Sequence, residues 1–219
     1  MNGNWGNSDG RTASLVWATP NAEALIAYIA RVSSSNQENP EYSRLFKYLV
    51  EHNHWSPFEH ATACIEINTT RDVAAQILRH RSFCFQEFSQ RYSSKIKPPA
   101  LPEMRIAGTT NRQSSISQEL TPGQKASVER AECLMHRTYE AYVDMVVMGV
   151  APESARSVLP LCTPTRMYMT GNVRSWIHYL KLRLDETTQK EHREVAQAVK
   201  AILDECFPTI MQLVFSKHS

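Results

Sequence analysis

The sequence lacks a run of about 18 apolar residues, the length needed to span a bilayer. Its first residues, MNGNWGNSDGR, also lack the apolar stretch of a signal peptide. Charge of either sign is hardly in excess, because 24 Lys and Arg against 22 Asp and Glu give a formal charge of +2. So small a charge leaves no broad positive field for non-specific nucleic-acid binding. We expect a folded, cytoplasmic protein without a membrane or nucleic-acid partner.

The cysteines are not spaced as in a zinc site or a redox motif. The five cysteines are odd in number and scattered, and no CxxC pair suggests a zinc or redox site. Reduced thiols are therefore expected. Cys162, in a proline-flanked stretch, is the best candidate for a nucleophile, although an isolated cysteine is usually only a small buried residue.

Helical and strand patterns fill most of the chain, and helix dominates. Alternation over 61–68 places Ala63, Ile65 and Ile67 on one face and predicts a half-buried strand, and 165–170 fits a second strand. Helical spacing predicts helices over 20–32, 42–49, 70–81, 122–150, 172–184 and 188–207, with a short one from Pro152 that holds Arg156. We expect one domain over 1–219, of the mixed α/β (α+β) class.

Local signals mark the ends and connections of these elements. Residues 1–12 read as a flexible end, and the proline-rich stretch 93–121 reads as a long internal connection. Thr19, Thr70 and Asn172 are placed to cap the helices that follow them. The apolar stripe of the 122–150 helix reads as ordinary core.

The densest group of chemically active side chains lies in residues 76–92. Arg79, Arg81 and Arg91 each present a planar fork of donors that matches phosphate oxygens in pairs, so together they suit a ligand carrying phosphate groups. Neighbouring amide, carboxylate and hydroxyl groups suit a polar base or sugar. The interleaved aromatic residues, which would exclude water or stack on a flat ring, are Phe83, Phe85, Phe88 and Tyr92.

Plainer interpretations of these residues stay open. The segment could be a solvated basic helix end whose Arg and His favour the helix dipole. The interleaved phenylalanines argue against this, because exposed aromatic side chains are a liability. His52, His54 and His60 have a spacing compatible with one metal ion, but no acidic residue completes a familiar ligand set, so we expect no metal.

Several segments resemble one known family. Arg79-His80-Arg81, seven residues and then Ser89 match RHRx7S, the specific signature of the flavin-dependent thymidylate synthases. The segments HWSPFEH (54–60) and ARSVLP (155–160) look like that family's HxSPFEH and ARxxLP, and Asn172-Val173-Arg174 and Leu182-Arg183 match later motifs in order. The resemblance spans roughly residues 15–210. It implies a helix-rich subunit with a central, mostly antiparallel sheet flanked by helices.

The resemblance also implies an activity, its ligands and their residues. The activity is reductive methylation of dUMP to dTMP, with 5,10-methylenetetrahydrofolate as carbon donor and NADPH-reduced FAD as hydride source. Residues implied for dUMP are Gln76, Arg79, Glu87, Ser89, Gln90, Arg91, Arg156 and Arg183. Residues implied for FAD are His60, Thr62, Arg79, His80, Arg81, Glu87, Asn172, Arg174 and His178. A homotetramer is implied as well, with sites shared between neighbouring subunits.

The implied pocket holds no obvious cysteine nucleophile, so our hypothesis for activating the uracil C5 is electrostatic. Arg183, set among apolar residues, would stabilise negative charge on the N3 and oxygen side of the base and is the expected catalytic residue. The absent GxGxxG motif excludes only a Rossmann-type flavin site. Cys84, Gln86 and Thr187 depart from residues common in relatives, which leaves the reaction class intact and concerns only fine contacts.

Two rival functions come from other classes. A nucleotide-binding or RNA-binding module would use the arginine and aromatic cluster for phosphate and stacking contacts, and would be colourless. A metal hydrolase built on His52, His54 and His60 would lose its activity to chelators.

Overall fold

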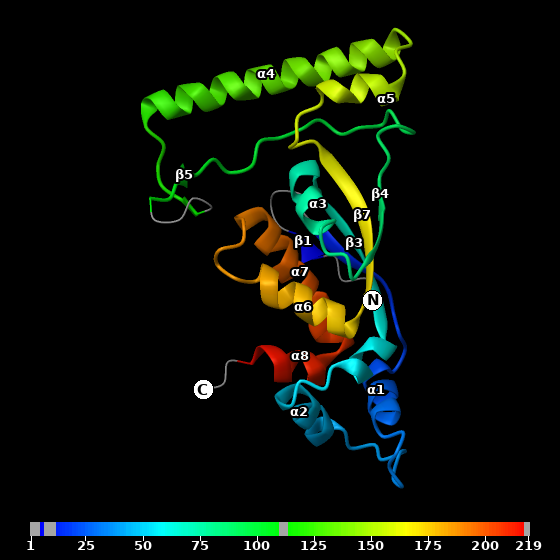
Figure 1. The fold of residues 1–219 in the computed structure, drawn as a ribbon. Helices are drawn as coiled ribbons and strands as arrows, with labels where there is room; N and C mark the ends of the chain where they lie inside the picture. Colours follow the sequence, from blue (N-terminus) through cyan, green and yellow to red (C-terminus); the bar gives the residue numbers. More distant parts are fainter. Residues whose placement is uncertain (1–4, 7–11, 110–113, 217–219) are drawn as a thin grey trace.

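The computed structural model describes residues 5–6, 12–109 and 114–216 (Figure 1). Its centre is an antiparallel sheet with the strand order β1-β2-β3-β7-β4. These strands are β1 Trp5–Gly6, β2 Thr12–Ala18, β3 Thr62–Thr70, β7 Pro164–Asn172 and β4 Cys84–Glu87. A small hairpin pairs β5 Ile106–Ala107 with β6 Ser115–Ile116 inside the 93–121 connection.

Helices account for more of the described chain than strands do. They are α1 Ala22–Ala30, α2 Ser43–Glu51, α3 Arg71–Ile77, α4 Pro122–Val147, α5 Pro152–Ala155, α6 Val173–Arg183, α7 Lys190–Cys206 and α8 Pro208–Phe215, with short 3-10 turns η1 Ser56–His60 and η2 Arg156–Val158. Each predicted helix is present, but α3 ends before Arg79 and α5 ends before Arg156, which begins the turn η2. Helix α8 was not predicted. Among the described residues, no helix combines the length and the apolar character needed to cross a bilayer.

The sheet carries its helices on one face. Ile65, Ile67, Met167 and Met169 are fully buried on the face against which α3, α6 and α7 pack (Figure 1). On the opposite face, side chains such as that of Arg166 are exposed. The mixed fold with an antiparallel sheet is confirmed.

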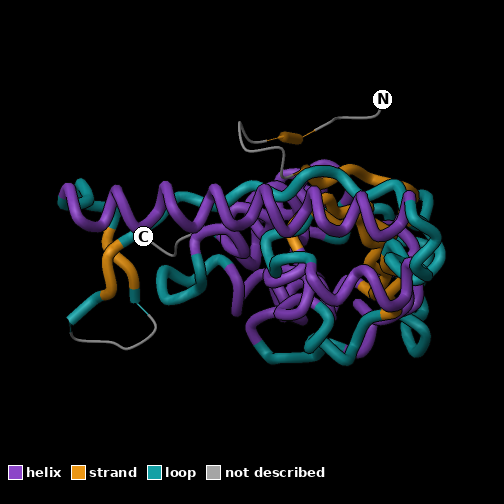
Figure 2. Tube along the Cα trace, turned by 90° about the horizontal axis from the view of Figure 1, so that it is seen from above, coloured by secondary structure: helices purple, strands orange, loops and turns teal. Residues whose placement is uncertain are grey.

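Helix α4 lies along one end of the molecule, apart from the helices that cover the sheet (Figures 1 and 2). Only Met135 and Tyr142 of α4 are buried, whereas Leu134 is 61% exposed and Val147 is 77% exposed. The prediction that its apolar stripe is ordinary core is therefore wrong. Helical periodicity shows that a stripe exists, but it does not show that the same chain covers the stripe.

The predicted helix caps have different outcomes. Asn172 caps α6, because its side chain accepts a hydrogen bond from the Ser175 amide at 2.8 Å. Thr19 caps no helix: α1 begins after Asn21, and the Thr19 hydroxyl accepts from the Thr62 amide at 2.9 Å. Thr70 precedes α3, but its hydroxyl donates to Asp72 and caps no backbone amide.

Part of the predicted flexible end pairs as strand. Trp5–Gly6 and Thr12 form strand pairs at the edge of the sheet, and the other residues of 1–12 lie outside the described residues. The connection over 93–121 is long, as expected, and residues 110–113 within it are likewise outside the described part.

Candidate active site

The arginine-rich segment forms a turn between α3 and β4. Arg79 and Arg81 are exposed on this turn, and His80 between them is buried at 8% exposure. Phe83 anchors the turn to the core, because its ring packs edge-on against Trp176 with centroids 4.7 Å apart. The turn thus presents two guanidinium groups to solvent on a fixed base.

The turn faces α6 across a cavity of about 980 Å³. Residues from the segment around the turn line one wall, and residues from α6 and the loop after it line the other. Of the residues predicted for ligands, this cavity brings together Gln76, Arg79, His80, Arg81, His178 and Arg183, which we call the first group. Two segments about 100 residues apart in sequence thus meet at one site.

His80 and Arg183 are in direct contact inside the first group. The Arg183 Nε donates to His80 Nε2 at 2.9 Å. Burial, followed by the charges of Arg183 and His178, lowers the pKa of His80 from 6.5 to about 4. The imidazole is therefore neutral at pH 7, and its Nε2 lone pair is free to accept from Arg183. This hydrogen bond orients the guanidinium at the cavity wall.

A buried hydrogen-bonded chain supports Gln76 from behind. His192, with no exposed surface, contacts Gln76 Oε1 through Nδ1 at 3.2 Å, and Gln76 Nε2 donates to Gln189 Oε1 at 2.6 Å. Gln189 in turn donates to Glu191 at 2.9 Å, and Arg105 holds Glu191 with two further bonds of 2.6 and 2.8 Å. The amide of Gln76 is thus fixed at both ends.

Burial is also the largest cause that lowers the pKa of His192 to about 3, with the charge of Arg183 next. Its ring is neutral, and because the Gln76 amide oxygen can only accept, Nδ1 carries the hydrogen. No sequence pattern marks the roles of His192 and Gln189, because their partner Gln76 lies more than 100 residues away along the chain.

A second group of predicted residues begins at the last residue of β4 and does not line this cavity. It consists of Glu87, Ser89, Gln90, Arg91 and Arg156. Glu87 accepts from Arg71 and, at 2.9 Å, from the Thr165 hydroxyl. Arg91 pairs with the carboxylate of Glu153 at 3.2 Å, and Arg156 donates to the carbonyl of the same residue at 3.3 Å. Arg91 and Arg156 thus share Glu153 as a partner, and Glu87 is held separately by Arg71 and Thr165.

A third group stands where β3 begins and β7 ends. It consists of His60, Thr62, Asn172 and Arg174. Thr62 and Asn172 are partners in the strand register, and Arg174 forms an ion pair with Glu59. The structure therefore divides the predicted site residues into three groups on one chain.

The alternative chemistries find little support in the geometry. Burial raises the pKa of the Cys162 thiol, the opposite of what a nucleophile needs, and its Sγ contacts Met135 Sδ at 3.4 Å. His52 stacks on Tyr48 with ring centroids 4.1 Å apart. Among the described residues, no three His, Cys, Asp or Glu side chains are grouped so as to hold a metal ion.

The fold defines the class of protein. It matches a solved structure described as the crystal structure of a UMP/dUMP methylase PolB from Streptomyces cacaoi bound with 5-Br dUMP. The TM-score is 0.80 at 26% identity, with 93% of this chain and 94% of the other covered. The chain thus has the fold of a pyrimidine nucleotide methylase.

Sequence comparison identifies the family. Residues 14–209 match the family described as thymidylate synthase complementing protein. A flavin-dependent thymidylate synthase of Synechocystis is 47% identical over 188 residues, covering 86% of this chain and 87% of the relative. A probable flavin-dependent thymidylate synthase of Paramecium bursaria Chlorella virus 1 is 44% identical, covering 91% and 93%. The chain belongs to the flavin-dependent thymidylate synthases.

Proposed function

We propose that this protein methylates dUMP at C5 to give dTMP, using a bound FAD. The observation that carries the proposal is the first group, in which a neutral His80 holds Arg183 at a cavity that also presents Arg79 and Arg81. The names of the relatives and of the solved methylase support the same reaction.

The first group suits a nucleotide. Arg79 and Arg81 have no carboxylate partner among the described residues, so their donor forks are available for phosphate oxygens. Arg183 is half-buried and stays charged in this setting. On the N3 and oxygen side of uracil it would stabilise the negative charge that makes C5 nucleophilic.

The residues present also fit a flavin. Its pyrophosphate requires cations, which the turn offers in Arg79 and Arg81, and its flat ring system requires a wide site, which a cavity of about 980 Å³ provides. His178 on α6 contributes to the same wall. When bound, FAD would supply the hydride that turns a carbon at the methylene level into a methyl group.

Two co-substrates complete the balance of the proposed reaction. 5,10-Methylenetetrahydrofolate gives the carbon, NADPH gives two electrons to the flavin, and the C5 hydrogen of dUMP leaves as a proton. No cysteine adds to C6 in this scheme. The exposed Cys84 lies on the edge strand β4, outside the first group, and Cys162 is buried with a raised pKa.

We further propose that the enzyme works as a homotetramer with shared sites. The second group carries predicted dUMP residues but does not line the cavity of the first group in its own chain. It would therefore complete the cavity of a neighbouring subunit. Exposed apolar side chains of α4, such as Leu134 and Val147, and the exposed Arg166 on the sheet leave surface for such contacts.

The visible spectrum of the purified protein, followed by hydrogen release from dUMP labelled at C5, tests the function. We expect flavin absorbance and a release that requires dUMP, the folate and NADPH. A protein that stays colourless after incubation with FAD would support the binding module instead. Release abolished by a chelator would support a metal enzyme, and the absence of any release would reject methylation.

A further inference from the structure

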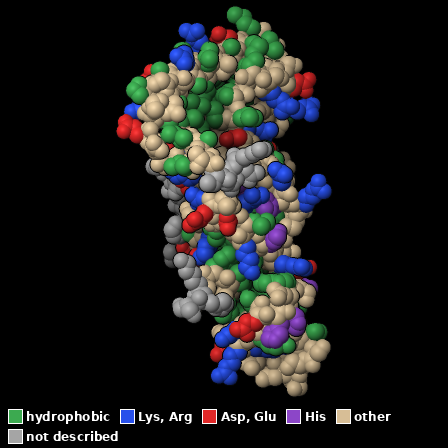
Figure 3. Space-filling model, turned by 60° about the vertical axis from the view of Figure 1, so that its left-hand side comes forward, with side chains coloured by type: hydrophobic (Ala, Val, Ile, Leu, Met, Phe, Trp, Pro, Cys, Tyr) green, Lys and Arg blue, Asp and Glu red, His purple; other side chains and the backbone are tan. Residues whose placement is uncertain are grey.

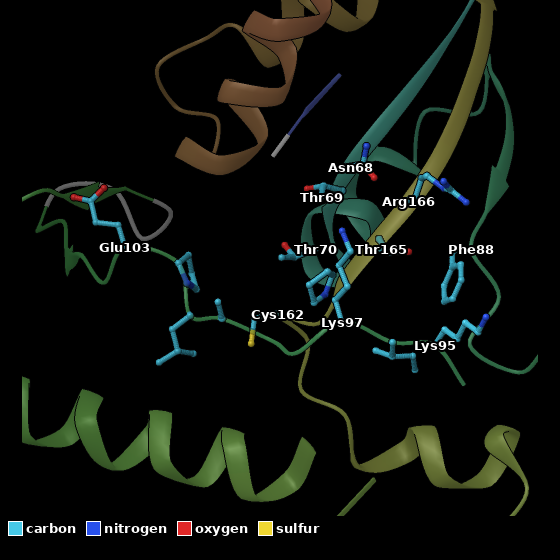
Figure 4. A pocket seen from close by; sticks show the side chains of 15 residues that line it. Asn68, Thr69, Thr70, Phe88, Lys95, Lys97, Glu103, Cys162, Thr165 and Arg166 are labelled. Carbon is cyan, nitrogen blue, oxygen red and sulfur yellow. The ribbon is translucent and has the colours of Figure 1, made fainter. Parts of the chain in front are cut away.

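A second cavity, of about 890 Å³, lies outside the three groups of predicted residues (Figure 4). The ends of β3 and β7 form one side of it, and the first part of the 93–121 connection forms the other. Its volume is within the range of small-molecule sites, roughly 300–1,000 Å³. The connection therefore does more than join elements, because it closes a cavity against the sheet.

Three positively charged side chains line this cavity, and none of them forms an ion pair with a described residue. Lys95, Lys97 and Arg166 are all exposed, and none of them has a carboxylate partner among the described residues. Glu103, an acid in the lining, forms an ion pair with Lys190 and lies 3.8 Å from Arg105. In Figure 4 Glu103 lies far from the three cations, so it does not neutralise them. The cavity has a positive end.

The inner wall is apolar, with one unpaired hydroxyl. Phe88, Ile96 and Leu101 contribute apolar surface. Thr69 is only 5% exposed, and its Oγ1 has no hydrogen-bond partner. Because a buried polar atom without a partner costs free energy, a ligand that bonds to it gains that energy. The fitting ligand has an apolar body, one polar group deep in the cavity and anionic groups at the positive end.

The cavity adjoins the second group through the strand pairing of β4. The Phe88 amide donates to the Arg166 carbonyl at 2.8 Å, and the Thr165 hydroxyl donates to Glu87 at 2.9 Å. Phe88, Thr165 and Arg166 line the cavity, and Glu87 is one of the residues proposed for dUMP and FAD. A ligand that reacts where Glu87 serves could therefore extend its far end into this cavity.

We propose that this cavity binds the p-aminobenzoyl-glutamate end of the folate co-substrate, with the carboxylates of a polyglutamate tail on Lys95, Lys97 and Arg166. The aromatic ring lies against Phe88 and Leu101, and the amide of the ligand bonds to Thr69 Oγ1. The proposal rests on the proposed function, because it assigns one of that reaction's co-substrates. Lysine suits separate carboxylates, which need charge more than a paired donor geometry.

Binding of free fragments tests the site without turnover. The probes are p-aminobenzoyl-monoglutamate and p-aminobenzoyl-pentaglutamate, titrated calorimetrically into the full-length protein. We expect the pentaglutamate to bind about 10-fold tighter at low salt, and this advantage to shrink as ionic strength rises, because the added carboxylates act by charge.

Two variants and a control locate the binding. Lys95→Gln with Lys97→Gln should remove most of the pentaglutamate's advantage, whereas Lys47→Gln with Lys125→Gln, on α2 and α4 and outside the cavity lining, should keep it. Thr69→Val should weaken both fragments by roughly 3–10-fold, the usual worth of one hydrogen bond. It should not lower the melting temperature, since it deletes a hydroxyl that has no partner in the protein. If the Thr69 hydroxyl instead only stabilises the fold, Thr69→Val should lower the melting temperature and leave the affinity for both fragments unchanged.

Three results would overturn the proposal: no binding of either fragment at millimolar concentration, equal losses in the lysine variant and its control, or binding of NADP⁺ weakened by the same substitutions. The last result would assign the cavity to the reductant. Flavin absorbance and C5 hydrogen release by the unmodified protein are measured separately, so failure of the cavity and failure of the proposed function give different outcomes.

Discussion

At the residue scale, the protonation state of His80 decides how Arg183 is held. A charged imidazole would have no lone pair at Nε2 and would repel the guanidinium, so the bond at 2.9 Å requires the neutral form. Burial supplies that form by lowering the pKa to about 4. His178, also near the cavity, adds a smaller effect in the same direction. The arginine is thus positioned by a partner that does not compete for its charge.

Replacing Arg183 tests the electrostatic hypothesis. Arg183→Ala should lower C5 hydrogen release by about 100-fold or more, the usual cost of losing one group that stabilises developing negative charge. Flavin absorbance should remain, because Arg79 and Arg81 are untouched. Arg183→Lys keeps the charge without the planar fork and should recover only part of the rate. Near-normal methylation by the alanine variant would reject the role.

The two buried histidines predict a dependence of stability on pH. In each, the folded pKa lies below the ordinary 6.5, at about 4 for His80 and about 3 for His192. Between those values and 6.5 the unfolded chain binds protons that the folded chain does not. The contribution of these neutral histidines to the free energy of unfolding is therefore fully present above pH 6.5. It is lost as the pH falls below 6.5, by about 1 kcal/mol per pH unit for each histidine.

Chemical denaturation from pH 7 to pH 4.5 measures this loss. Carboxylates contribute their own acid dependence, so the comparison that isolates one histidine is with His192→Asn, which keeps a donor toward Gln76. The slope of unfolding free energy against pH should be smaller in this variant. An unchanged slope would show that His192 titrates normally in the folded protein.

At the scale of elements, the sequence predicts the strands whose apolar residues follow a regular pattern. Alternation revealed β3 and β7 because each buries one face. It missed β2, in which the register shifts between Leu15 and Trp17 and the alternation breaks. It also missed β4, a four-residue edge strand. These two missed strands are short or irregular, so pairing with neighbours stabilises them more than their own pattern does.

The approach of β7 to the arginine-rich turn depends on Gly171. A Cβ at this position would overlap the Phe83 ring, which packs against Trp176. Gly171→Ala should therefore displace Phe83 and with it the turn, at a cost of about 1–3 kcal/mol, typical of overpacking. Denaturant unfolding gives the free energy, and C5 hydrogen release reports on the turn.

Gly123 provides the matched control. It lies in the first turn of α4, and a Cβ there meets nothing within 4 Å. Gly123→Ala should leave both stability and activity within error or raise stability slightly, because it stiffens the unfolded chain. If both alanine variants lose the same amount of stability, crowding at Phe83 is not the cause.

At the scale of the whole molecule, the predicted site residues of one chain do not meet at a single cavity. The first and second groups occupy opposite ends of β4, and the two cavities have no lining residue in common. Hydrophobic side chains gather at the end that carries α4 (Figure 3), where Leu134 and Val147 remain exposed. Motif spacing could select these residues as candidates, but it could not show that the fold separates them into three groups, because spacing along the sequence carries no information about distances in space.

Mixing two inactive variants tests whether sites are shared. Arg183→Ala disables the first group, and Arg91→Ala disables the second at a position whose side chain is 66% exposed, so folding should survive. If each site joins the first group of one subunit to the second group of another, subunits exchanged at equal ratio should regain about a quarter of normal hydrogen release. Each half of a site then has about one chance in two of being intact. Sites contained within single chains would stay inactive after exchange, since every chain carries one defect.

The control is Lys47→Gln mixed with Arg183→Ala, in which activity should fall only in proportion to the disabled first groups. Light scattering should give the mass of the same oligomer in every sample.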